Sequence, residues 1–449
     1  MENNKKGKNF FSTILIIVMI VVLVSFYRKY DFNYYSKGLI NDGSVSFSRD
    51  NKREDGRQRS YKIENHNFTE SMFFKEIPVK SNTPYRVSCM VKTEEVEQLD
   101  NNSMAGAQII LKDTEEHSKV ISGTNDWTKL EFCFNSKNND TATIGFSLGG
   151  NFAKAKGTAW FADLSIEEGA LIDDDVWKFA CVVFQDTNAK LDNGTQIQEK
   201  LNSKENAQIK TMISKFETSL GQISKNKIKA KCYLINIDEP ITSFSYDNSC
   251  GYYVSEKDVY NLINEYIEKE GFDHIFACFK MPDEVDLGQE DVLDWVGLGN
   301  MEYCGIGFSD IRIIENEYST RTNFPQEVLV HEFSHTLERN AKEYGYEIPE
   351  LHAYEKYGYK ESNMDRLKKW YTDYLCGEIK DENGMYIGLP EEIFQYKPAK
   401  NINFTYANKL DLLEDPYGIK EIFNCIKYQI TNLFKHSSET TYVIKTVSS

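Results

Sequence analysis

Two histidines and a glutamate in the second half of the chain have the types and spacing of a metal-activated hydrolytic site. They are His331, Glu332 and His335, within the stretch 323–344, NFPQEVLVHEFSHTLERNAKEY. Residues four apart on a helix lie on one face, so both imidazoles can bind one metal ion. Glu332 then faces the open side of that ion, where a carboxylate can take a proton from bound water.

The surrounding sequence predicts that this motif lies on a partly buried helix. Asn323 is a suitable N-cap, Pro325 falls in the first turn, and Gly345 follows the last turn. An apolar stripe supports the same helix and consists of Leu329, Val330, Phe333 and Leu337. The alternative is a surface helix with two stray histidines. The agreement of caps, stripe and motif favours the metal site.

A catalytic zinc needs a third protein ligand and one open position for water. The stretch 345–355 offers His352 and Glu355. A chain reversal at Gly345 can return His352 to the metal, because the helix travels about 13 Å beyond His335 and the extended chain that follows spans about 26 Å. Two imidazoles and one further ligand suit Zn²⁺. We predict His331, His335 and His352 as zinc ligands, with Glu355 as the alternative third ligand.

The H-E-x-x-H helix resembles that of the zincin metalloproteases. This resemblance implies a zincin-like α/β domain that hydrolyses peptides, in which Glu332 takes a proton from water and returns it to the leaving amine. Ala341 stands where a metzincin has its third histidine, and the N-E-x-x-S-D pattern of gluzincins is absent. The oxyanion needs a second donor, and the tyrosine candidates are Tyr354, Tyr357, Tyr359 and Tyr371.

Strands and helices alternate before this motif, which indicates an α/β layer. The predicted strands are 176–184, 230–237 and 273–279, and the predicted helices are 195–220 and one opened by Ser255 with Asp258 as its capping partner. Residues 304–314 form a further predicted strand. In zincins an edge strand at this point pairs with the extended substrate; an ordinary edge strand is the alternative.

Residues 31–170 read as an all-β sandwich, because short alternating strands are separated by turn residues. The predicted strands begin at Phe73, Tyr85, Ala107, Thr128, Ala142 and Thr158. The segments 81–85, 123–127 and 157–163 resemble the jelly-roll carbohydrate-binding-module family. That resemblance implies glycan or protein binding, with Trp127 and Trp160 as candidates for stacking on a sugar. A place in the core or at a strand edge is the alternative for both.

An uncharged run, residues 10–27, is long enough to cross a hydrocarbon layer of about 30 Å. We predict a retained signal-anchor in the cell membrane with a cytoplasmic N-terminal stub and an extracellular remainder; a cleaved signal peptide, and hence secretion, is the alternative. The net charge of −17 argues against nucleic acid as a partner. Nine cysteines without a C-x-x-C pair indicate neither a zinc ribbon nor a dithiol redox site.

Together these patterns predict a multidomain protein: residues 1–30 are the stub and transmembrane helix, 31–170 the β-sandwich, and 171–449 a zincin-like metallopeptidase domain. The predicted activity is zinc-dependent hydrolysis of a peptide or protein outside the membrane. One alternative is a surface glycan-binding or adhesion protein with an inactive zincin-like domain. The other is a zinc hydrolase that acts on a substrate other than a peptide.

Overall fold

A computed structural model describes residues 33–36, 44–50, 60–99, 104–150, 153–169, 176–191, 194–269, 271–282, 296–314, 324–359, 364–398 and 408–410. Within these ranges, every helix is too short or too polar to cross a membrane. The predicted membrane-spanning run 10–27 lies outside the described residues.

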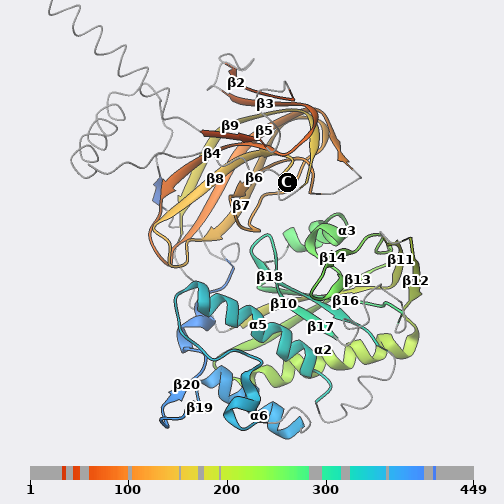
Figure 1. Cartoon of the computed structure of the whole chain (residues 1–449), viewed down its shortest axis with the longest axis vertical. Coiled ribbons are helices and arrows are strands. Elements are labelled where there is room, and N and C mark those ends of the chain that lie inside the picture. The colour runs from red at the N-terminus through yellow and green to blue at the C-terminus, as the bar shows by residue number, and fades with distance from the viewer. Residues whose placement is uncertain are drawn as a thin grey trace, which may run out of the picture.

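The N-terminal half forms a sandwich of two antiparallel sheets, as the alternating pattern predicts (Figure 1). One sheet has the order β1 (Asn33–Ser36), β4 (Ser71–Pro78), β8 (Thr141–Leu148), β6 (Ala107–Leu111). The other has the order β2 (Val45–Asp50), β3 (Ser60–Thr69), β9 (Ala155–Glu168), β5 (Pro84–Gln98), β7 (Gly123–Asn135), and β21 (Asn408–Leu410) pairs with β9. The inner faces meet through aromatic side chains, such as the rings of Phe146 and Phe161, whose centroids lie 5.2 Å apart.

The second half is built on a five-stranded sheet. Its order is β13 (Lys229–Ile237), β10 (Val176–Phe184), β16 (His274–Phe279), β18 (Ile306–Arg312), β17 (Gly297–Tyr303), and only β17 runs antiparallel to its neighbour. All residues of β16 and β18 are buried. Strands of this kind need cover on both faces.

Different elements cover the two faces of this sheet (Figure 1). On one face lie α2 (Ser203–Ile223), α5 (Glu327–Glu343) and α6 (Met364–Cys376), where Phe216 and Phe333 pack edge-on against Phe179 of β10. On the other face lies α3 (Glu256–Lys269), and the same apolar core continues into the β-sandwich. The sandwich therefore packs on the α3 side of the sheet, and α5 lies on the opposite side.

The remaining elements are short. They are the hairpins β11 (Asp186–Lys190) with β12 (Gln196–Lys200), β14 (Ser245–Asp247) with β15 (Gly251–Tyr253) and β19 (Ile379–Lys380) with β20 (Tyr386–Ile387), and the 3₁₀ helices η2 (Ala353–Tyr357) and η3 (Glu391–Gln395).

Two sequence predictions in this half were wrong in part. The helix predicted over 195–220 begins only at Ser203, after an Asn202 cap that forms a full capping box with Glu205. The residues before it form β12, whose Ile197 is buried as a strand residue. The strand predicted over 304–314 is β18, which lies inside the sheet because β17, folded back as a hairpin, occupies the edge.

Asp310 on β18 ties three elements together. It is fully buried, and its two carboxylate oxygens accept hydrogen bonds from the N–H groups of Val254, at 2.9 Å, and Leu298, at 3.1 Å. Val254 follows β15 and Leu298 belongs to β17. Burial raises the pKa of Asp310 to about 8, although the two N–H donors oppose that shift. The side chain thereby fixes the edge strand to the interior of the sheet.

We predict that Asp310→Ala lowers the free energy of unfolding by about 1–3 kcal/mol for each backbone N–H that it leaves unpaired in the core. Because the folded pKa is raised, the contribution of the protonated carboxyl is complete below the ordinary value of 3.8 and is lost as the pH rises through about 8. Urea unfolding at acidic pH and above the raised pKa measures both effects. Asp140→Ala, at an exposed position, is the control. Equal stability of Asp310→Ala and wild type at every pH would contradict the assignment.

Candidate metal centre

The predicted motif lies on α5, as the apolar stripe indicates, but the helix begins later than expected. It spans Glu327–Glu343 with Gln326 at the N-cap position, and Asn323 lies outside the described residues. The end is as predicted: Gly345 has a left-handed φ of 85°, and the N–H groups of Gly345 and Tyr346 return to Lys342 and Ala341. This is a Schellman ending, which reverses the chain toward the third candidate ligand.

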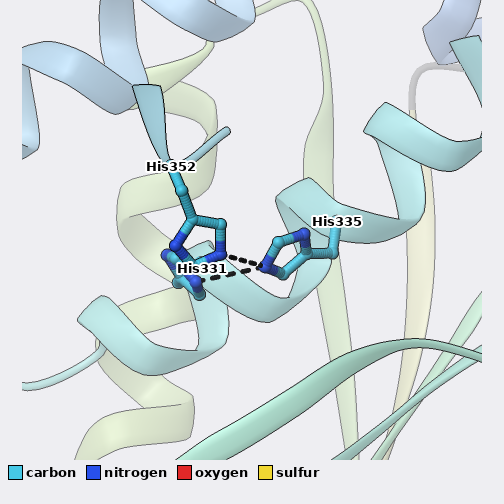
Figure 2. Close-up of side chains that lie close together, drawn as sticks. All are labelled: His331, His335 and His352. Carbon is cyan, nitrogen blue, oxygen red and sulfur yellow. Dashed lines mark hydrogen bonds between the residues drawn. The ribbon is translucent and has the colours of Figure 1, made fainter. Parts of the chain in front are cut away.

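The structure brings His331, His335 and His352 together (Figure 2). The Nε2 atom of His335 lies 3.2 Å from Nε2 of His331 and 3.0 Å from Nε2 of His352. His331 and His335 are half-buried and His352 is exposed, so the cluster opens to solvent on one side. Glu355, the alternative third ligand, is exposed and lies outside this cluster.

The outer ring nitrogens of the two α5 histidines are fixed by hydrogen bonds. The Tyr371 hydroxyl donates to Glu327 Oε1 at 2.5 Å, so its lone pair accepts from His331 Nδ1 at 2.9 Å. Glu338 accepts from His335 Nδ1 at 3.2 Å. We therefore assign the Nδ1–H tautomer to both rings. Such outer partners orient the histidine ligands of metal sites and make them more basic.

The arrangement of the inner nitrogens fits a zinc ion. With Nδ1 protonated, Nε2 of His331 and of His335 each present a lone pair at 3.2 Å, and either a metal ion between them or a second proton on one ring removes their repulsion. A tetrahedral zinc with Zn–N bonds of about 2.0–2.1 Å has N···N edges of about 3.3–3.4 Å. The observed separations of 3.0 and 3.2 Å are close to this edge.

Glu338 does more than orient His335. Its carboxylate also accepts from the Leu351 N–H and from Lys342, each at 3.0 Å. Burial raises the pKa of Glu338, but these hydrogen bonds and the charge of Lys342 lower it to about 2. The contact with Leu351 fixes the residue before His352, so one carboxylate positions both His335 and the third histidine.

The segment that carries His352 is also held by α6. The Trp370 indole donates to the Leu351 carbonyl at 3.0 Å, and the Tyr374 hydroxyl donates to the Pro349 carbonyl at 3.1 Å. The aromatic side chains Trp370, Tyr371 and Tyr374 of α6 are buried. They therefore form part of the scaffold that returns His352 to α5.

Glu332 lies between α5 and the edge strand β17. Its side chain is 3% exposed, and a Cβ added at Gly299 would lie 2.7 Å from Oε2. A bulge between Leu298 and Met301 interrupts the pairing of β17 with β18, and the Gly299 N–H donates to Glu332. Burial, with the nearby charges of Asp310 and Glu327, raises the pKa of Glu332 well above its ordinary value. The glycines thus make room for the Glu332 carboxylate against β17, where the Gly299 backbone also approaches His335.

Two tyrosines named as oxyanion donors have other partners. Tyr371 orients His331, and Tyr359 donates to Asp373. Sequence analysis missed Glu327, although it precedes His331 by one helical turn and so lies on the same face. Tyr371 comes from a different helix, and no local signal links it to His331.

No protein-family model matches the chain, and neither does any curated protein. The solved structures that resemble part of the chain include several carbohydrate-binding modules. CBM4 shares 15% identity with a TM-score of 0.21 over 30% of this chain and 86% of that one. TmCBM61 in complex with β-1,4-galactotriose shares 13% identity with a TM-score of 0.22 over 31% of this chain and 92% of that one. The CBM22-1 xylan-binding domain of Paenibacillus barcinonensis Xyn10C shares 13% identity with a TM-score of 0.18 over 30% of this chain and 93% of that one. At these scores the likeness decides nothing about function.

We predict that Tyr371→Phe weakens zinc binding by about 10- to 100-fold, because His331 loses the acceptor that fixes its ring. Competition for zinc with a fluorescent chelator measures the change. Tyr85→Phe is the control, since it removes a buried tyrosine hydroxyl that accepts from the Lys80 N–H in the β-sandwich and takes no part in holding the histidines. Equal affinities of both variants and wild type would show that Tyr371 has no part in the site.

The third ligand is tested by two substitutions that lie three residues apart. His352→Ala should abolish stoichiometric zinc binding at the α5 site, because only two protein ligands remain. Glu355→Ala should retain it, because that side chain lies outside the cluster. Isothermal titration with zinc distinguishes the two variants. Zinc binding that survives His352→Ala and is lost in Glu355→Ala would reverse the ligand assignment.

Proposed function

We propose that the protein is a zinc-dependent metallopeptidase that hydrolyses peptide bonds outside the membrane. The observation that carries the proposal is the convergence of three imidazoles, two with protonated outer nitrogens, beside a buried glutamate on the same helix. A metal site with three histidines and an open side has the ligand number of a catalytic zinc rather than of a closed structural one.

When zinc is bound at such a site, the chemistry that it supplies is a lowered pKa for bound water and polarisation of a carbonyl group. Glu332 accepts the water proton and later delivers it to the leaving amine. A general base works best when its pKa is near the operating pH, and burial shifts Glu332 in that direction. Tyr371 and Glu338 hold the imidazoles in place while the proton moves.

A peptide substrate can be aligned by β17. This strand is the last of its sheet on the side of α5, so an extended chain could pair with the backbone groups of its outer edge that no side chain binds. The Leu298 and Gly299 N–H groups and the Met301 carbonyl are already bound by side chains. The bulge of β17 lies next to Glu332, so the backbone of a peptide paired with β17 would pass close to this proposed general base. The geometry thus favours a peptide over a compact small-molecule substrate. We assign to β17 the substrate-pairing role that the sequence suggested for 304–314.

The cellular setting of this proposal follows from the sequence. The apolar run 10–27 would anchor the protein in the membrane and place the zinc site outside the cell.

The sandwich would be an accessory domain. Its Trp160 has the ammonium groups of Lys62 and Lys92 at 5.3 and 5.6 Å from the ring. These cations occupy the indole, so Trp160 is a poor stacking platform for a sugar.

We predict that Glu332→Gln lowers peptide hydrolysis by at least about 100-fold, because the amide cannot accept the water proton, while zinc content stays unchanged. Cleavage of a peptide library, followed by mass spectrometry, measures activity, and elemental analysis measures zinc. Glu355→Gln is the control, an exposed carboxylate near the site. Full activity in Glu332→Gln, or no cleavage of any peptide by zinc-loaded wild type, would contradict the proposal.

A further inference from the structure

A second group of metal-ligating side chains lies where the sandwich meets the α/β half. His117 belongs to the loop between β6 and β7, Glu256 is the first residue of α3, and Cys304 lies in the turn between β17 and β18. Their ligand atoms lie within 4.8 Å of one another. The histidine and the glutamate are 2% and 6% exposed, so this group is far more buried than the histidine cluster on α5.

The contacts of the three ligand atoms are short and mutual. His117 Nε2 lies 2.8 Å from Glu256 Oε1 and 3.2 Å from Cys304 Sγ, and Sγ lies 3.1 Å from Oε1. His117 Nδ1 lies 2.6 Å from the Ser118 carbonyl, which can only accept, so Nδ1 carries a proton. Nε2 then faces a carboxylate and a sulfur. A metal-ligating histidine typically donates its other ring N–H to a carbonyl group in this way.

The turn that carries Cys304 is unusual for this residue. Cys304 and Gly305 both have positive φ, 48° and 76°, as the central residues of a two-residue hairpin turn. Asparagine or aspartate followed by glycine normally occupies such a turn, because a side chain with an ordinary Cβ is strained there. The geometry of the turn therefore does not explain a cysteine at this position. The contacts of its thiol with His117 and Glu256 do.

Negative charge accumulates around the group. Glu116 is 4% exposed, lies against Gly305, and its Oε2 has no hydrogen-bond partner among the described residues. The nearby bases are engaged elsewhere, since Lys137 pairs with Glu343 and Arg339 pairs with Glu302. Glu256 is paired with His117, whereas one oxygen of Glu116 is buried beside the turn of Cys304 without such a partner, and a buried carboxylate of this kind favours a nearby cation.

We propose that His117, Glu256 and Cys304 bind a second zinc ion, which joins the β-sandwich to the α/β half. A thiolate, an imidazole and a carboxylate form a ligand set that zinc accepts, and their burial suits a structural role. The ion would bind the loop of one half to a helix start and a hairpin turn of the other. That turn ends the strand whose bulge lies beside Glu332, so this zinc would also hold the edge strand in place.

The test uses the full-length protein, loaded with zinc, desalted and analysed for metal. Wild type should hold two zinc ions per chain. Cys304→Ser and His335→Ala should each lose one, and Cys250→Ser, in a turn of the α/β half, should lose none. Cys304→Ser should lose the ion of this site and keep the ion on α5, and His335→Ala should do the reverse. The failure of one proposal can therefore be distinguished from the failure of the other.

A spectroscopic measurement covers the case in which a variant fails to fold. Cobalt-loaded wild type and His335→Ala should both show a thiolate-to-cobalt charge-transfer band, and Cys304→Ser should lack it. X-ray absorption at the zinc edge of wild type should detect sulfur among the ligands. One zinc per chain, lost in His335→Ala, with no sulfur ligand, would overturn the proposal and leave a hydrogen-bonded group of His117, Glu256 and Cys304.

Discussion

The candidate site depends on two hydrogen bonds made by the outer nitrogens of histidines rather than by the atoms that face the ion. The hydroxyl of Tyr371, already donating to Glu327, accepts from His331, and the carboxylate of Glu338 accepts from His335. These contacts turn two lone pairs toward one point, where neutral rings would otherwise avoid each other. Glu338 also fixes the chain before His352, so a single buried carboxylate links two of the three imidazoles.

The rest of the fold places these groups. The parallel strands are buried on both faces, which puts α5 against the sheet and leaves β17 at its edge. Asp310 holds β17 from inside, and the glycines and bulge of β17 open a space for the Glu332 carboxylate. The stability of the sheet and the position of the proposed base are therefore coupled through one strand. The proposed zinc between His117, Glu256 and Cys304 would act on the far end of that strand.

Sequence reasoning found what is local and periodic. The sandwich strands, the buried strand Val176–Phe184 and the apolar stripe of α5 follow from alternation and helical spacing. The return of His352 could be predicted because Gly345 reverses the chain and the reach is short. The start of the helix predicted over 195–220 was wrong, because the spacing of Ile197 fits a helix although this residue lies in the β11–β12 hairpin. The contact of Tyr371 with His331, the role of Asp310 and the His117 group could not be found, because each depends on tertiary contacts between distant segments.

We propose that three imidazoles bind one zinc ion and that the Glu332 carboxylate lies near this ion without coordinating it. An anomalous-scattering map of zinc-loaded crystals, recorded on both sides of the zinc edge, tests this claim most directly. We expect a zinc peak shared by the Nε2 atoms of His331, His335 and His352, with the Glu332 carboxylate outside the coordination shell. A map without zinc at these atoms, or with His352 turned away from a peak held by other side chains, would contradict it.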